Sequence, residues 1–167
     1  MNIRILNEDD AQSYQKVRLS ALKNNPEAFG STYEREVGFS LETIKERIAL
    51  STDHFVLGAF DHDCALIGIA TFMRENIIKM RHKANVFGVY VVPKSRGRGV
   101  SKLLMAELIR KAKNCDGLEQ LNLGVVSDNV AAKKLYNSLG FKVYGVERKA
   151  LKFDGHYFDE DLMVLYI

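Results

Sequence analysis

One stretch of the sequence decides the fold: Val89-Tyr90-Val91-Val92-Pro93-Lys94-Ser95-Arg96-Gly97-Arg98-Gly99-Val100-Ser101-Lys102-Leu103-Leu104. It begins as a β-branched and aromatic run, which favours a strand. A proline breaks that run, and a basic loop with two glycines follows it. The stretch then continues with leucines at helical spacing. We therefore predict a strand, an anion-binding loop and a helix in direct succession.

The physical chemistry of this joint favours phosphate as the anion. The first N–H groups of a helix lack internal partners and carry the positive end of the helix dipole. Gly97 and Gly99 permit positive φ angles and leave room for close approach of a ligand. Four basic side chains surround the loop, namely Lys94, Arg96, Arg98 and Lys102. A diphosphate group would suit this combination of free N–H groups and basic side chains.

Two other phosphate loops fit this stretch poorly. A Walker loop requires G-x-x-x-x-G-K-[ST], and a dinucleotide-binding fingerprint requires a third glycine or alanine where Lys102 stands. The stretch resembles the [QR]-x-x-G-x-[GA] loop of the GNAT superfamily of acyl-CoA-dependent N-acetyltransferases, through Arg96, Gly99 and Ser101. The serine departs from that pattern but is small. A basic solvated loop before a surface helix is the alternative interpretation.

A second motif strengthens the resemblance to the GNAT superfamily. The segment from Ser127 to Phe141 reads as a short capped helix closed by Gly140. Within it the residues resemble the superfamily signature N-x-x-A-x-x-L-Y-x-x-x-G-F, through Asn129, Ala132, Leu135, Tyr136, Gly140 and Phe141. Both motifs occur in the expected order, and the resemblance is strongest from about residue 84 to 145.

The resemblance implies an α/β fold for a single domain spanning residues 1–167. Its central β-sheet would be mixed and splayed between two parallel strands, with helices on both faces. It also implies acetyl-CoA as cosubstrate. Backbone atoms of Val89, Tyr90 and Val91 would pair with the pantetheine arm, and Asn129 would hydrogen-bond that arm. The pyrophosphate would be held by the loop residues Arg96, Gly97, Arg98, Gly99, Val100 and Ser101.

Tyr136 is the predicted general acid. It lies seven residues after Asn129, about two helical turns, so both side chains can face one groove. A tyrosine of pKa ~10 stays protonated at neutral pH and can donate a proton to a departing thiolate at short range. The sequence predicts direct acetyl transfer to a primary amine of a small molecule, without a covalent enzyme intermediate.

The general base stays open, because an alkylamine of pKa ~10 is mostly protonated at neutral pH and must lose a proton. The candidates are Glu34, Glu36, Glu75, His54 and His82, and a water chain is equally compatible with the sequence. Three other functions are alternatives: acetylation of protein or peptide N-termini, a non-catalytic acyl-CoA sensor, and a phosphate-loop kinase. No aspartate stands out as the Mg²⁺ ligand that a kinase would need.

The first half of the chain predicts two helices and a hairpin. After a strand at residues 3–6, Asn7 should cap a helix with apolar residues at positions 11, 14, 17, 21 and 22. Residues 26–36 have no clean period, and Phe29 and Tyr33 are either core residues or part of a pocket lining, with the core favoured. Ser40 should cap a second helix with Leu41, Ile44 and Ile48 facing inward. Residues 54–60 and 65–74 read as an antiparallel hairpin.

The second half predicts the strands that frame the two motifs. Residues 84–92 form the strand that leads to the phosphate loop, and the following helix should end near Lys113. Residues 118–126 follow as a strand that should lie parallel to it, because strand, helix and strand form a right-handed crossover. A further strand begins at residues 143–146, and the Asp154-Gly155 turn should pair it with the last strand.

The composition restricts the remaining function classes. The chain has 167 residues, of which 47% are hydrophobic and 27% charged, which suits one soluble domain. A net charge of +3 is too small to imply nucleic acid. No apolar signal or membrane-spanning segment is apparent, so we expect a cytoplasmic protein without a membrane partner. The two cysteines and four histidines have no ligand spacing, so no metal is expected, and a homodimer is as compatible as a monomer.

Overall fold

The computed structural model describes residues 1–167. It contains one sheet of seven strands in the order β1-β2-β3-β4-β5-β7-β6. The strands are β1 (Asn2–Ile5), β2 (His54–Phe60), β3 (Leu66–Arg74), β4 (Lys83–Val91), β5 (Gln120–Val126), β6 (Lys142–Phe153) and β7 (His156–Tyr166). The helices are α1 (Ala11–Asn24), α2 (Tyr33–Glu36), α3 (Leu41–Ile48), α4 (Val100–Ala112) and α5 (Val130–Ser138).

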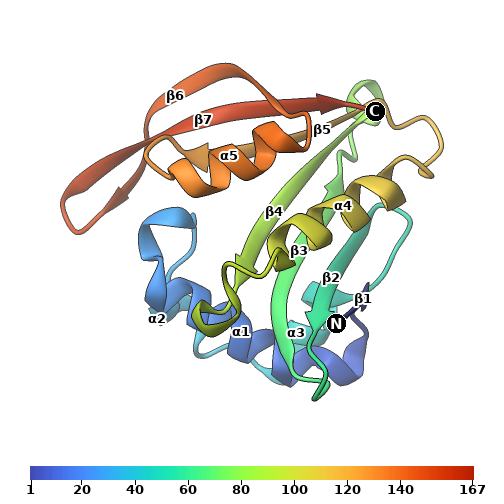
Figure 1. The fold of residues 1–167 in the computed structure, drawn as a ribbon, viewed down its shortest axis with the longest axis vertical. Helices are drawn as coiled ribbons and strands as arrows, with labels where there is room; N and C mark the ends of the chain where they lie inside the picture. The colour runs from blue at the N-terminus through green and yellow to red at the C-terminus, as the bar shows by residue number, and fades with distance from the viewer.

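The sheet is mixed and splayed, as predicted. All neighbouring strands are antiparallel except β4 and β5, which are parallel. These two pair only at Lys83 with Gln120, Ala84 with Leu121, and Asn85 with Asn122. Beyond that point they diverge, so that β5, β6 and β7 lie apart from the rest of the sheet (Figure 1). Their separation exposes strand edges that would otherwise hydrogen-bond each other.

Helices cover both faces of the sheet, which confirms the expected GNAT-type layering. On one face α4 packs with the core of β2 to β5 through the fully buried residues Leu104, Met105 and Leu108, and Tyr136 of α5 joins this cluster. On the other face α1 and α3 bury residues such as Tyr14 and Ile44 against β2, β3 and β4. Leu41 is a correction to the sequence prediction, since it is 45% exposed at the first turn of α3.

Ser40 caps α3 as predicted, whereas Asn7 caps a short 3-10 turn, Glu8–Asp10, that leads into α1. The Asn7 side chain accepts a hydrogen bond from the N–H of Asp9, and Asp10 completes a capping box before α1. Ser40 caps α3 by accepting from the N–H of Thr43 at 3.2 Å. These caps satisfy backbone donors that a helix cannot pair internally.

Glycines mark two irregularities on β3 and β4. The register of β2 against β3 shifts beside Gly68, where a Cβ would lie 3.0 Å from Leu104 Cδ1. On β4, Tyr90 pairs with Ile69 and Phe87 pairs with Thr71, so Gly88 and the next residue form a bulge. Gly88 has a φ of +60°, which favours glycine.

The β6–β7 hairpin closes through the predicted Asp154-Gly155 turn, in which both residues have positive φ angles. Its tip projects from the body of the protein (Figure 1). β6 is the outer edge of the sheet and exposes several apolar side chains, including Tyr144 (61%) and Val146 (46%). The possible homodimer named from the sequence stays a prediction.

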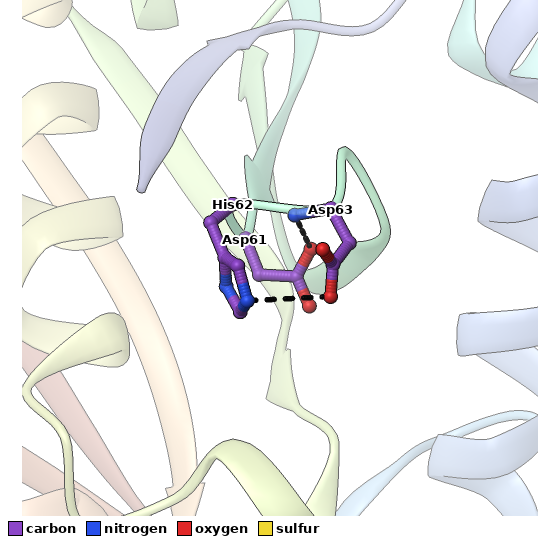
Figure 2. A group of neighbouring side chains, drawn as sticks. All are labelled: Asp61, His62 and Asp63. Carbon is purple, nitrogen blue, oxygen red and sulfur yellow. Dashed lines mark hydrogen bonds and ion pairs between the residues drawn. The ribbon is translucent and has the colours of Figure 1, made fainter.

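A cluster of possible metal ligands occurs in the β2–β3 turn, where Asp61, His62 and Asp63 lie within 4.8 Å of one another (Figure 2). The sequence analysis did not single it out. Asp61 Oδ1 accepts hydrogen bonds from the N–H groups of Asp63 and Ala65, so this carboxylate stabilises the turn in which it lies. His62 and Asp63 are highly exposed.

No helix in the structure has both the length and the apolar composition needed to cross a membrane. Cys64 and Cys115 are free thiols, as their isolated positions in the sequence indicated.

Candidate active site

The loop between β4 and α4 has the backbone geometry of an anion-binding site. Gly97 and Gly99 have φ angles of +74° and +77°, so both occupy the left-handed region predicted from the sequence. The N–H groups of residues 97–102 donate to no backbone carbonyl. The next N–H group, that of Leu103, donates a hydrogen bond to Gly99 O. No acidic residue stands in the first turn of α4. Six successive N–H groups at a positive helix end are therefore available to an anionic ligand.

The Arg96 side chain hydrogen-bonds to other segments of the protein. Its Nε donates to Val91 O at 3.0 Å, and its Nη2 donates to Asn25 Oδ1 at 2.8 Å. The guanidinium also lies 5.4 Å from the centre of the Tyr90 ring. Arg96 thus links the loop to β4 and to the end of α1. Lys94, Arg98 and Lys102 are exposed and form no ion pair, so their positive charge is available to a ligand.

A cavity of about 770 Å³ opens where β4 and β5 diverge. Its strand walls are residues 86–89 of β4 and residues 123–126 of β5, and side chains of α1, α3 and α5 complete it. Val89, Asn129 and Tyr136, among the predicted site residues, line this cavity. Tyr90, Val91 and the loop residues 96–101 lie outside its lining. The predicted site residues therefore fall into two sets, those that line the cavity and those that lie on the loop or on β4 outside the lining.

Asn129 and Tyr136 face the same cavity, as the helical spacing predicted. Asn129 is the N-cap of α5, and its Oδ1 accepts from the N–H of Ala132 at 3.1 Å. That bond leaves the side-chain NH₂ group as a donor. Tyr136 is only 7% exposed and packs near Phe141, with ring centres 6.0 Å apart. Burial raises the pKa of Tyr136 to about 12, so its hydroxyl keeps its proton at neutral pH.

The sequence placed Phe29 and Tyr33 either in the core or in a pocket lining and favoured the core, and the structure shows that Phe29 both packs against the core cluster and lines the cavity. Phe29 is half-buried and lines the cavity, with its ring edge against Tyr90 at 6.3 Å. Tyr33 is also half-buried, lies beneath Lys23 Nζ at 4.2 Å, and borders a separate hollow. Their segment lacks a hydrophobic period, so nothing in it distinguishes a core aromatic from one in a cavity wall.

Three charged residues form a network beside the cavity. Arg18 Nε and Nη2 donate to the two carboxylate oxygens of Glu36 at 3.0 and 2.9 Å, and Arg47 Nη1 donates to Glu36 Oε2 at 2.8 Å. Burial would raise the pKa of Glu36, but hydrogen bonds from Arg18 and Ser31 and the two positive charges outweigh it. The pKa falls from 4.5 to about 2. Glu36 is therefore a poor general base, although the sequence listed it as one.

Glu160 is a carboxylate in the cavity lining that the sequence analysis missed. It stands on β7 opposite Val126 of β5. Burial, and then repulsion by Glu147, raises the pKa of Glu160, which makes its carboxylate a stronger base. Only the β5–β7 register brings it to the cavity. No local pattern in the sequence marks this glutamate among the twenty-one acidic residues.

The other base candidates are placed less favourably. His54 lines the cavity, with Nδ1 3.0 Å from Ala49 O. Glu75 accepts a hydrogen bond from Asn85 at 2.7 Å and lies outside the lining, and so do Glu34 and His82.

The chain was compared with known families and solved structures. Residues 3–162 match the sequence model of a family described as the acetyltransferase (GNAT) domain. The chain belongs to this family. It is 31% identical over 97 residues to the L-amino acid N-acetyltransferase AaaT of Escherichia coli strain K12. That match covers 58% of this chain and 59% of the relative, which is less than two thirds of its length.

Solved structures share the whole fold. A GNAT-family acetyltransferase from Streptococcus pneumoniae superposes with a TM-score of 0.88 at 23% identity, over 99% of both chains. The yncA acetyltransferase of Salmonella typhimurium, solved with its cofactor acetyl-CoA, gives a TM-score of 0.81 at 23% identity. That comparison covers 99% of this chain and 93% of the Salmonella chain.

Proposed function

We propose that this protein is an N-acetyltransferase that moves an acetyl group from acetyl-CoA directly to the primary amine of a small molecule. The observation that carries the proposal is the pairing of a loop of six unpaired N–H groups with a cavity between two diverging parallel strands. Family membership supports it. The curated relative is named for acetylating L-amino acids, and a structural neighbour was solved with acetyl-CoA.

The residues present fit acetyl-CoA. Its pyrophosphate carries the negative charge that the N–H groups of residues 97–102 can bind. Lys94, Arg98 and Lys102 add positive charge around this site. The open edge of β4 offers backbone groups near Val89 to the amides of a pantetheine arm, and Asn129 offers its NH₂ group. When bound, acetyl-CoA supplies an acetyl group activated as a thioester.

Tyr136 and Glu160 move the two protons that the reaction requires. The amine must lose a proton to become nucleophilic, and the Glu160 carboxylate accepts it. The departing thiolate must gain a proton or a hydrogen bond, and the Tyr136 hydroxyl donates it. The pKa of about 12 keeps Tyr136 in its donor form throughout the neutral range. After attack the nitrogen loses a second proton, which restores the Tyr136 hydroxyl once it has donated to the sulfur. Overall the ammonium group loses two protons, of which one ends on the sulfur and the other passes through Glu160 to solvent.

A panel of amines tests the proposal. Free thiol released from acetyl-CoA is measured with small-molecule amines, N-terminal peptides and arylamines as acceptors. The proposal expects turnover with one or more small amines. Turnover only with peptides would favour an N-terminal acetyltransferase, and cofactor binding without any turnover would favour a sensor. A cytoplasmic location and the lack of a nucleic-acid partner stay predictions from the sequence.

A further inference from the structure

The network of Arg18, Glu36 and Arg47 holds more positive than negative charge at the cavity wall. Two guanidinium groups share one carboxylate, and both arginines line the cavity. The Arg18 and Glu36 side chains are only 8% and 1% exposed, whereas the Arg47 side chain is 35% exposed, so water screens the excess charge only in part. Burying a charge without a partner is costly. The network is therefore suited to receive an anionic group from the cavity.

The arginine nitrogens that remain unpaired point to where that anion would bind. Glu36 occupies Nε and Nη2 of Arg18 and Nη1 of Arg47. Arg18 Nη1 and the second terminal nitrogen of Arg47 have no hydrogen-bond partner in the protein. Arg18 Nη1 lies 4.0 Å from the position a Cβ would take on Gly88, at the bulge of β4. The missing side chain at Gly88 leaves space for a ligand beside this nitrogen.

The β5 side of the same cavity has a negative group. Glu160 Oε2 lies 3.0 Å from the position a Cβ would take on Gly124, and both residues belong to the lining. Glycines thus stand on both diverging strands, Gly88 beside the arginines and Gly124 beside Glu160. A molecule with a carboxylate at one end of its polar group and an amine at the other would match this distribution of charge.

We propose that Arg18 and Arg47, held in place by Glu36, form a subsite for the carboxylate of an α-amino acid acceptor. The amino group of the same molecule then faces Glu160. This inference rests on the proposed transfer function and names the acceptor class and the residues that select it. Glu46 and His54 also line the cavity, and neither neutralises the arginines through a hydrogen bond.

Matched pairs of acceptors test the subsite. L-leucine is compared with 3-methylbutylamine, and L-phenylalanine with 2-phenylethylamine, so that each pair differs only by the carboxylate. The wild-type protein should have the lower KM for the amino acid of each pair. Arg47→Gln should raise the KM for the amino acids by roughly tenfold to a hundredfold, because a charge-assisted hydrogen bond is lost. It should leave the KM for the amines and kcat nearly unchanged.

Two further variants complete the design. Arg47→Lys keeps the charge but loses the planar guanidinium group, so its KM for amino acids should lie between those of the wild type and Arg47→Gln. Arg110→Gln, whose partner Glu107 lies on the same exposed face of α4, is the control and should change neither KM. Arg47 is chosen over Arg18 because its side chain is 35% exposed and its replacement is more compatible with folding.

The outcomes separate the two proposals. A wild-type protein that acetylates amines but prefers them without a carboxylate, or an Arg47→Gln variant that loses both acceptors equally, would overturn the subsite alone. If no amine were acetylated, the transfer function would fail. Calorimetry with L-leucine and 3-methylbutylamine would then decide the subsite, which requires that the amino acid bind more tightly and that Arg47→Gln abolish the difference.

Discussion

Replacement of Glu36 should make the stability of this protein much less dependent on pH. Its carboxylate is 1% exposed and joins Arg18 of α1 to Arg47 of α3. The pKa is lowered from 4.5 to about 2, and this difference corresponds to about 3 kcal/mol of folding free energy. Because the folded-state pKa is the lower one, this contribution is complete above about pH 4.5. It disappears as the pH falls toward 2.

Urea unfolding of the wild-type protein and Glu36→Gln at several pH values between 7 and 2 measures this effect. At pH 7 the variant should be less stable, since its amide cannot neutralise the buried Arg18 and the partly exposed Arg47. The difference in unfolding free energy should shrink by about 3 kcal/mol across the acid range. Asp10 and Asp161 also have lowered pKa values, but they are common to both proteins and cancel. A difference that stays constant with pH would refute the assigned pKa.

Three further predictions concern the site itself. Tyr136→Phe should lower kcat by about a hundredfold with little change in acetyl-CoA affinity, and an unchanged kcat would refute its role as proton donor. Gly99→Ala should destabilise the protein by about 1 kcal/mol, since φ is +77° there, and should weaken acetyl-CoA binding in calorimetry; unaltered binding would count against the loop. Glu160→Gln should lower kcat/KM, and the decrease in kcat/KM at acid pH that protonation of Glu160 causes should disappear. If the variant kept that decrease, Glu160 would be excluded as the base.

Much of the fold was predictable because its signals are local. The two glycines of the loop, the Asn129 cap and the Asp154-Gly155 turn each carry a backbone requirement that a few adjacent residues reveal. The parallel placement of residues 84–92 and 118–126 followed from the helix between them. These features were therefore available from the sequence alone.

The acceptor side of the site was not predictable for the opposite reason. Glu160 reaches the cavity through strand register, and Arg18 meets Glu36 across a separation of 18 residues in the chain. Arg96, predicted to bind the pyrophosphate, also donates to a β4 carbonyl and to Asn25, which is 71 residues away, and these contacts have no local signal in the sequence. Contacts between distant segments decide what these side chains do, and composition or periodicity does not record them.

Calorimetric titration with acetyl-CoA and with S-acetylpantetheine, which lacks the diphosphate, tests most directly whether the loop at residues 97–102 holds a diphosphate. We predict one-to-one binding of acetyl-CoA and far weaker binding of S-acetylpantetheine, because the six unpaired N–H groups would then have no anion to bind. No association with acetyl-CoA, or equal affinity for the two compounds, would contradict the account.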